Sequence, residues 1–312
     1  MRTEIVRLDH VSKKYRDVTA LDGVSFTLER DRIYGLLGRN GAGKTTVMSI
    51  LTAQGFATSG RVDVFGEDPY ENEKVLSRIC FIRESQKYPD DFKPMDAFRS
   101  AALFYRNWDH RLAMDLVDDF ALPLKRRIKK LSRGQLSAVG VIIGLASRAE
   151  LTFFDEPYLG LDAVARQLFY DRLLADYAEF PRTVVLSSHL IDEVANLLEH
   201  VIVIDKGTII LDDDADNIRG SAVTLAGPAA RVDSFAAGRA VLHRERIGAM
   251  ESLTLEGALT AVERREAREL GLELNAVSLQ QLVIRKTLDT GAGLPDGAGP
   301  EQHSTTRTGA AR

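Results

Sequence analysis

Short apolar runs alternate with amphipathic stretches along most of the chain. Residues 33–37, 151–154 and 183–187 are largely apolar, and polar residues follow each run. Continuous apolar runs of this length predict strands buried on both faces of a parallel sheet. Apolar residues at helical spacing predict helices in the stretches 94–108, 110–121, 163–178 and 190–198. The order of these elements predicts an α/β fold.

Both ends of the chain follow other patterns. Apolar and hydroxyl residues alternate in 24–28, so residues 4–11 and 23–28 are predicted to form half-buried strands. Residues 216–290 mix short strands with helices and predict a small α+β appendage. The last segment, 291–312, is rich in Gly, Thr and Ala and has hardly any large apolar residues, which predicts a disordered tail.

A glycine loop joins the strand at 33–37 to a following helix. It reads Gly-Arg-Asn-Gly-Ala-Gly-Lys-Thr-Thr over residues 38–46 and fits the P-loop pattern G-x-x-x-x-G-K-[ST]. The glycines let backbone N–H groups converge on one point, and the helix N-terminus adds partial positive charge there. Lys44 is predicted to contact the β- and γ-phosphates, and Thr45 to contact Mg²⁺. The alternative, a glycine-rich turn that binds nothing, is disfavoured by the flanking strand and helix.

Two acids end the second apolar run. Asp155 and Glu156 follow the strand at 151–154, at the carboxyl end where α/β sheets place their ligands. With a P-loop upstream, Asp155 is predicted to lie in the shell of Mg²⁺. Glu156 is predicted to orient and deprotonate a water that attacks the γ-phosphate in line. A plain strand-end turn is the alternative interpretation of this Asp-Glu-Pro.

Composition narrows the class of protein. The chain has 312 residues and a net charge of −4, which leaves no electrostatic footprint for nucleic acid apart from a local basic run at 125–130. A single cysteine, Cys80, favours a reducing compartment and a core position in its apolar run. No signal peptide is expected, and the longest apolar stretch, 139–146, is far too short to cross a bilayer. Work at a membrane would therefore need another chain to cross it.

Residues 131–135 read Leu-Ser-Arg-Gly-Gln, which is similar to the signature L-S-G-G-Q of the ATP-binding cassette (ABC) ATPases. The resemblance runs from about residue 5 to 212 and includes the P-loop and the Asp155-Glu156 pair. It implies a P-loop NTPase fold with an antiparallel β subdomain, a helical subdomain at about 87–148 and a cassette ending near residue 215. The signature of one subunit is expected to bind the γ-phosphate of ATP held by the opposite subunit, because a helix N-terminus is an anion site.

The same resemblance implies roles residue by residue. His189 matches the switch histidine, Gln86 the Q-loop glutamine, Asp162 the D-loop and Tyr15 the aromatic that stacks on adenine. Expected catalytic residues are Glu156, His189 and Gln86. Expected Mg²⁺ contacts are Thr45, Gln86 and Asp155. Expected ATP contacts are Tyr15, Gly38, Asn40, Gly41, Gly43, Lys44, Thr45, Thr46, Ser132, Gly134, Gln135 and Asp162.

Two segments depart from the family pattern. Arg133 replaces the first glycine of the signature pair, and ATP binding is expected to survive because this side chain can point to solvent. The Q-loop reads Arg-Glu-Ser-Gln over 83–86 instead of ending in Pro-Gln, which leaves the identity of the membrane partner open. Aromatic residues at 104–108 form either core or a docking surface for that partner.

The resemblance implies an ATPase subunit of a bacterial ABC exporter. We expect it to bind ATP and Mg²⁺, to pair head to tail with a second ATPase subunit, and to drive a separate transmembrane permease from the cytoplasmic face of the membrane. No nucleic-acid partner is expected. The alternatives are a soluble ABC ATPase that acts on a macromolecular complex and a regulatory protein that holds ATP without turning it over. The presence of Glu156 and His189 disfavours the second alternative.

Overall fold

A six-stranded sheet forms the centre of the molecule. The computed structural model describes residues 3–84 and 86–289. The strand order is β5-β6-β7-β3-β8-β9, with β9 antiparallel to β8 and the other neighbours parallel. The strands are β3 (Ile33–Leu37), β5 (Ile79–Arg83), β6 (Leu151–Asp155), β7 (Thr183–Ser188), β8 (His200–Asp205) and β9 (Thr208–Asp214). Strands β3, β6 and β7 are buried along their whole length, as their apolar runs predict.

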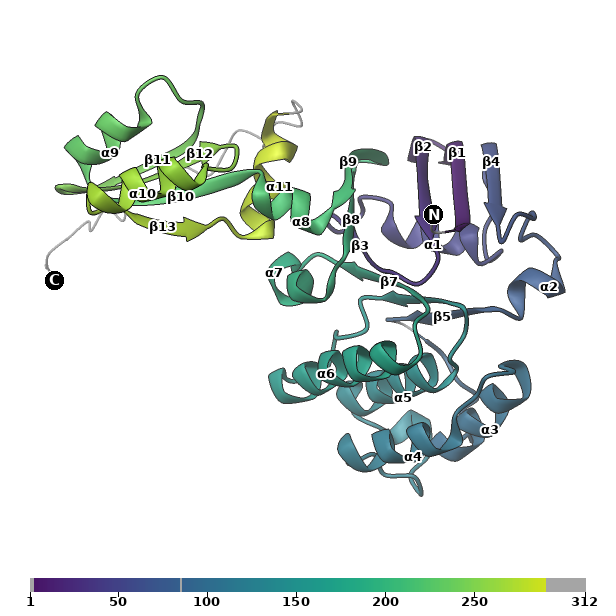
Figure 1. Ribbon diagram of the computed structural model, residues 1–312. Helices are drawn as coiled ribbons and strands as arrows, with labels where there is room; N and C mark the ends of the chain where they lie inside the picture. The colour runs from purple at the N-terminus through teal and green to yellow at the C-terminus, as the bar shows by residue number, and fades with distance from the viewer. Residues whose placement is uncertain (1–2, 85, 290–312) are drawn as a thin grey trace, which may run out of the picture.

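A second, antiparallel sheet covers one face of the central sheet. Its order is β2-β1-β4. The strands are β1 (Glu4–Tyr15), β2 (Val18–Glu29) and β4 (Ser59–Val64). Helix α1 (Lys44–Leu51) contributes Val47, Met48 and Leu51 to the core that joins the two sheets. Figure 1 shows this purple sheet at one end of the molecule and a layer of helices at the other.

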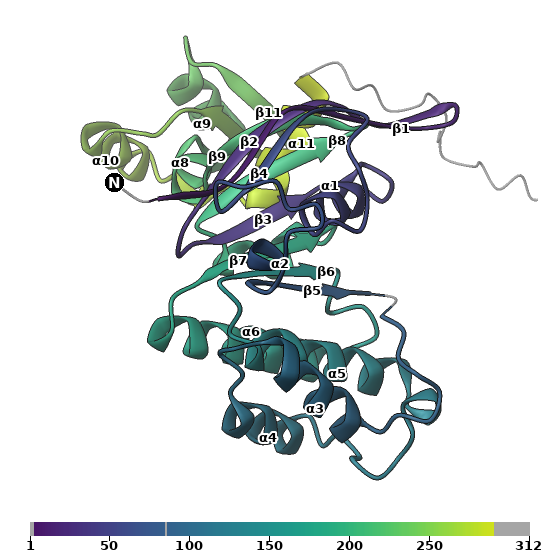
Figure 2. The same ribbon diagram turned by 90° about the vertical axis from the view of Figure 1, so that its right-hand side faces the viewer.

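The helices pack on the opposite face of the central sheet, as Figure 2 shows from the side. They are α3 (Pro94–Phe104), α4 (His110–Asp119), α5 (Arg133–Ala146), α6 (Ala163–Glu179) and α7 (Ile191–Val194). Short elements complete this part of the chain: α2 (Glu73–Leu76) and the 3-10 turns Ile128–Lys130 and Ala195–Leu197. The fold is the predicted α/β P-loop architecture with an antiparallel subdomain and a helical subdomain.

Two predicted helices are shorter than expected. The helix predicted over 94–108 ends at Phe104, because Tyr105 has an extended backbone with φ −103° and ψ 112°. The predicted 190–198 helix divides into α7 and a 3-10 turn at Val194. The aromatic segment also divides: Phe98 is buried in the core, Tyr105 and Trp108 pack against that core, and Phe104 is exposed.

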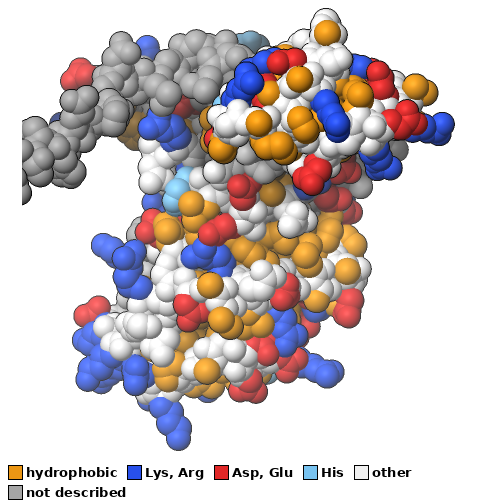
Figure 3. Space-filling view, turned by 90° about the vertical axis from the view of Figure 1, so that its left-hand side faces the viewer, with side chains coloured by type: hydrophobic (Ala, Val, Ile, Leu, Met, Phe, Trp, Pro, Cys, Tyr) orange, Lys and Arg blue, Asp and Glu red, His pale blue; other side chains and the backbone are white. Residues whose placement is uncertain are grey.

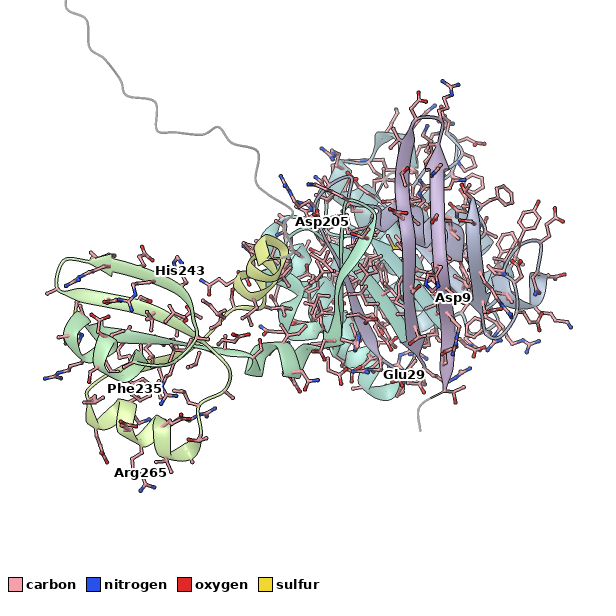
Figure 4. The ribbon with its side chains drawn as sticks, turned by 90° about the horizontal axis from the view of Figure 1, so that it is seen from above. Asp9, Glu29, Asp205, Phe235, His243 and Arg265 are labelled. Carbon is pink, nitrogen blue, oxygen red and sulfur yellow. The ribbon has the colours of Figure 1, made fainter. Side chains whose placement is uncertain are left out.

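A third sheet with the order β11-β12-β10-β13 forms the appendage. Its elements are α8 (Ala215–Gly220), β10 (Ala222–Pro228), α9 (Ala229–Ala236), β11 (Val241–Ile247), β12 (Met250–Glu256), α10 (Ala261–Glu269), β13 (Glu273–Ala276) and α11 (Leu279–Asp289). Phe235 and Leu253 belong to a separate small core between this sheet and helices α9 and α10. Figure 4 shows Phe235 and Arg265 on the helix-covered side of the sheet and His243 on the other side.

The appendage returns to the cassette through its last helix. Leu282 and Val283 of α11, with Ile218 of α8, are buried in the same core as the helical layer. A boundary at residue 215 therefore separates the sheet of the appendage from the other two sheets, but it does not separate the cores, because α8 and α11 pack with the helices of the cassette. The domain division stays a prediction. The predicted disorder of 291–312 concerns residues outside those described.

Charge is unevenly spread on the surface. In Figure 3, Lys and Arg side chains gather at one lower corner of the molecule, at the height of α3 and α4. The basic run at 125–130, between α4 and α5, keeps five exposed cations: Lys125, Arg126, Arg127, Lys129 and Lys130. Within residues 3–84 and 86–289, every helix is too short or too polar to cross a bilayer.

Candidate nucleotide site

The glycine loop between β3 and α1 opens onto a cavity of about 440 Å³. Gly43 adopts φ +119°, and a Cβ at this position would approach Leu21 to 2.8 Å. The loop therefore needs glycine here for both its conformation and its packing. Its curled backbone ends at the N-terminus of α1, where N–H groups and the helix dipole favour an anion.

Lys44 is the buried cation of this cavity. Its Nζ donates to the carbonyl oxygen of Gly38 at 2.7 Å and to that of Arg39 at 3.2 Å. The same Nζ lies 3.3 Å from Oε1 of Glu156. A buried ammonium is costly unless it is paired, so these contacts hold the lysine folded over the loop.

Thr45 and Asp155 meet across the cavity. The Thr45 hydroxyl donates to Oδ2 of Asp155 at 2.7 Å, and the Ser187 hydroxyl donates to Oδ1 at 2.7 Å. In the part of the chain that the structure describes, no group of three or more His, Cys, Asp or Glu residues could hold a metal ion. One carboxylate and one hydroxyl nevertheless suit Mg²⁺, which keeps waters and binds substrate phosphates instead of an all-protein cage.

Glu156 takes an unusual backbone conformation directly after β6. Its φ is +51°, in the left-handed region that non-glycine residues rarely adopt. Its N–H donates to the Ser187 hydroxyl at 3.1 Å, which fixes the turn. Oε2 lies 2.7 Å from Nδ1 of His189 and also accepts from the Tyr158 hydroxyl. Backbone strain of this kind, held by neighbouring groups, is typical of functional sites.

Nine of the predicted site residues line this one cavity, and they come from the glycine loop, from α1, from the end of β6 and from the segments that follow β6 and β7. The predicted residues that line the cavity are Asn40, Gly41, Gly43, Lys44, Thr45, Thr46, Asp155, Glu156 and His189. Ala20, Arg39, Glu84 and Leu159 line it as well, and the sequence did not single them out.

Of the residues expected to contact the ATP of their own chain, three lie outside the lining: Gly38, Tyr15 and Gln86. Tyr15 ends β1 and is half exposed, and Lys13 Nζ lies 4.7 Å from its ring centroid. Gln86 is also absent from the lining, whereas Glu84, the first residue after β5, is part of it. The signal for Glu84 was its position at the carboxyl end of a strand, which also singled out Asp155.

The signature residues lie at the start of α5, away from the cavity lining. The Ser132 hydroxyl caps the helix by accepting from Gln135 N at 3.2 Å, and the Gln135 side chain accepts from Ser132 N at 3.2 Å. Asp162 caps α6 in the same way by accepting from Ala165 N at 2.8 Å. Both helices therefore begin with ordered, partly exposed polar groups.

The start of α5 packs on the loop that carries Glu156. A Cβ at Gly134 would lie 2.7 Å from the carbonyl oxygen of Gly160. The Ser137 hydroxyl donates to the carbonyl oxygen of Leu159 at 2.6 Å. Arg133, the departure from the signature, is exposed, and its guanidinium lies 3.8 Å from the Glu84 carboxylate. The helical layer thus contacts the Glu156 loop directly.

A sequence profile described as "ABC transporter" matches residues 21–159, a span that contains the glycine loop, the signature and both acids. The chain contains an ABC ATPase domain. ATP binding and ATP hydrolysis are the activities of this family. The ABC resemblance inferred from the motifs is therefore confirmed.

Curated relatives of this ABC ATPase include several transport proteins. The doxorubicin resistance ATP-binding protein DrrA of Mycobacterium tuberculosis is 30% identical over 65% of this chain and 62% of DrrA. The ABC transporter ATP-binding protein YtrB of Bacillus subtilis is 25% identical over 69% of this chain and 74% of YtrB. The bacitracin transport ATP-binding protein BcrA of Bacillus licheniformis is 27% identical over 69% of this chain and 71% of BcrA.

Solved structures share the fold. An ATP-binding subunit of an ABC transporter superposes with a TM-score of 0.63 at 22% identity, covering 69% of this chain and 92% of that one. A dimeric post-hydrolysis state of the cassette MJ0796, bound to ADP and phosphate, has a TM-score of 0.60 at 20% identity and covers 68% and 99%.

Proposed function

We propose that this chain is the ATP-hydrolysing subunit of an ABC exporter. It pairs head to tail with a second ATPase subunit around two ATP–Mg²⁺ and drives a separate transmembrane permease. The observation that carries the ATPase chemistry is the convergence of Lys44, Asp155 and Glu156 on one cavity beside a glycine loop. Export is supported by the names of three relatives: the doxorubicin resistance protein DrrA, the bacitracin transport protein BcrA and the lantibiotic transport ATP-binding protein SrtF of Streptococcus pyogenes.

Each cavity residue has a defined part in this proposal. Lys44 leaves Glu156 for the β- and γ-phosphates, while the loop N–H groups hold the phosphate oxygens. Thr45 and Asp155 would hold Mg²⁺, which would supply positive charge to the phosphate oxygens. Glu156 takes a proton from water, whose oxygen bonds to the γ-phosphorus as the bond to the β–γ bridging oxygen breaks. His189 contacts the γ-phosphate and steadies Glu156.

The second subunit completes the site. Ser132, Gly134 and Gln135 lie outside the cavity of their own chain, and Ser132 and Asp162 are exposed. We place these residues against the ATP of the opposite subunit, where the N-terminus of α5 faces the γ-phosphate. The family pattern gives Tyr15 an adenine contact and Gln86 a sensing role between Mg²⁺ and the permease, and both roles belong to the same proposal. ATP then closes the dimer, and hydrolysis reopens it.

The permease contacts the helical layer between residues 87 and 148. Leu103 and Phe104 are the largest exposed apolar side chains of α3, with exposed fractions of 87% and 74%. Exposed aromatic side chains are enriched at protein interfaces. This contact holds the subunit at the cytoplasmic face of the membrane.

Glu156→Gln tests the proposal. This variant is expected to bind ATP but to lose steady-state hydrolysis by at least about a hundredfold, because the amide cannot take the proton. It is also expected to accumulate as an ATP-bound dimer in sedimentation experiments. Glu269→Gln, on exposed helix α10, is the matched control and should keep wild-type turnover. Full hydrolysis by Glu156→Gln would contradict the assignment of the base.

Co-purification from membranes tests the transport partner. The subunit should be recovered in the membrane fraction with a chain that contains several hydrophobic spans. Recovery with ribosomes or with DNA, and without such a chain, would instead support the soluble alternative.

A further inference from the structure

Tyr158 is buried beneath the proposed catalytic base. Only 1% of its surface is exposed, and its hydroxyl donates to Oε2 of Glu156. It occupies the turn after β6, in which Leu159 N donates to the carbonyl oxygen of Glu156 at 3.1 Å. The phenol therefore folds back on the residue two positions earlier in the chain.

The hydroxyl is itself held from the other side. It lies 2.8 Å from the Ser188 hydroxyl, which also accepts from Leu190 N at 2.8 Å. Burial, together with the hydrogen bond to Glu156, raises the pKa of Tyr158, so the phenol stays protonated and remains a donor. Arg166 lies over the ring, with its Cζ 5.5 Å from the centroid. These contacts fix the position of the hydroxyl.

The two oxygens of the Glu156 carboxylate consequently differ. Oε2 contacts the Tyr158 hydroxyl and, at 2.7 Å, Nδ1 of His189. Oε1 is buried, and among the described residues it has no hydrogen-bond partner; its nearest cation is Lys44 Nζ at 3.3 Å. Once Lys44 turns to the phosphates of ATP, Oε1 becomes the oxygen available to a water molecule.

We propose that Tyr158 is a positioning residue for ATP hydrolysis, which anchors Oε2 of Glu156 so that Oε1 faces the attacking water. The inference rests on the proposed role of Glu156 as the base. Without the phenol hydroxyl, the carboxylate turns about its last side-chain bond and Oε1 leaves the line of attack. A small displacement of a catalytic group is enough to cost one to two orders of magnitude in rate.

Tyr158→Phe removes only the hydroxyl. We expect kcat for ATP hydrolysis to fall about tenfold to a hundredfold, while KM for ATP and the midpoint of thermal unfolding stay close to wild type. A purely structural role would instead lower the thermal midpoint and leave kcat per folded molecule unchanged. Tyr170→Phe is the matched control, because Tyr170 is also buried and its hydroxyl has no hydrogen-bond partner among the described residues. It should retain wild-type kcat.

Ser188→Ala provides a second test from the far side of the phenol. It removes the Ser188 hydroxyl and leaves Tyr158 in place, so kcat should fall by less than in Tyr158→Phe, again with unchanged KM.

Unchanged kcat in folded Tyr158→Phe would overturn the inference, and so would an equal fall in Tyr170→Phe. Glu156→Gln in the same assay separates the two proposals: if it abolishes turnover while Tyr158→Phe does not lower it, only the role of Tyr158 fails. If Glu156→Gln hydrolyses ATP normally, the proposed base is wrong and the role of Tyr158 falls with it.

Discussion

The Nζ of Lys44 and the Oε1 of Glu156 lie 3.3 Å apart in the cavity, and more than nine-tenths of each side chain is buried. The proposed phosphate ligand and the proposed base thus pair with each other and compete with ATP for the lysine. We expect Glu156→Gln to raise the affinity of the monomer for ATP about fivefold, equivalent to about 1 kcal/mol, because this competing ion pair is gone.

Fluorescence titration with an ATP analogue on monomeric protein measures this change. Lys44→Ala is the companion variant and should lose at least tenfold in affinity, since the phosphates lose their buried cation. Weaker binding by Glu156→Gln than by wild type would show that Glu156 does not restrain Lys44.

Ser132→Arg tests the sharing of the site between two subunits. The side chain of Ser132 caps α5 outside the cavity of its own chain, so an arginine there should leave ATP binding to the monomer within about twofold. It should raise the dissociation constant of the ATP-dependent dimer by at least about tenfold, because the bulky, charged arginine side chain does not fit between the two subunits. Analytical ultracentrifugation with Glu156→Gln as background gives the readout.

Ser77→Arg introduces the same charge at an exposed position near α2 and should leave the dimer intact. ATP-dependent dimers of normal stability in the Ser132→Arg protein would remove the signature from the proposed interface.

Phe104→Ser tests the docking surface. Because 74% of this side chain is exposed, the free energy of unfolding should change by less than about 0.5 kcal/mol. Recovery of the membrane-spanning chain in co-purification should fall clearly. Val262→Ser, equally exposed on α10, should not affect recovery. Phe98→Ala, on the buried side of α3, should cost about 3–5 kcal/mol of stability. Normal recovery with Phe104→Ser would move the docking surface elsewhere.

His200 makes the stability depend on pH. Burial alone would lower its pKa, but hydrogen bonds to Asp212 at 2.7 Å and Asp214 at 2.8 Å outweigh burial and raise the pKa above 6.5. Because the pKa of His200 is higher in the folded protein than in the unfolded chain, its protonation stabilises the fold. This stabilisation is fully present at a pH below the pKa of the unfolded chain, and it is lost as the pH rises through the pKa of the folded protein. Wild type should therefore exceed His200→Asn in stability by about 1 kcal/mol near pH 5.5.

The difference in the free energy of unfolding between wild type and His200→Asn should shrink steadily towards alkaline pH. Urea unfolding of both proteins between pH 5.5 and 9 measures it. Arg32 also binds Asp214. The same comparison of His200 with asparagine can therefore be repeated in the Arg32→Gln protein, in which Asp214 lacks its second cation. A stability difference that grows with pH would show that His200 is neutral in the folded protein.

The hydrophobic pattern of the sequence predicts the strands of the central sheet, but it predicts the elements of the appendage much less completely. Runs such as 151–154 lie in strands that are buried on both faces, so composition alone marks them. Hydrophobic periodicity does not predict helix α9 or strand β13, because they are only eight and four residues long. The end of α3 at Phe104 could not be located from spacing, since the backbone of Tyr105 sets it.

The motifs indicated chemistry but not contacts. The pairing of Lys44 with Glu156 joins residues more than a hundred positions apart, and no local pattern carries that information. Tyr158 reads as an ordinary core aromatic until the turn after β6 is seen to direct its hydroxyl onto Glu156. The family pattern indicates Gln86, whereas the cavity is lined by Glu84, the first residue after β5.

The close approach of Gly134 to Gly160 has a consequence for inherited variation. Gly134 has no room for a methyl group, since a Cβ there would meet the Gly160 carbonyl oxygen at 2.7 Å. Gly160 adopts φ +95°, which disfavours any side chain, and a Cβ there would lie 3.2 Å from Arg133. A missense change at either glycine should therefore displace the loop that carries Glu156 and lower turnover. In an alignment of relatives the two positions should co-vary, with a larger residue at one accompanied by a shifted or shortened loop at the other.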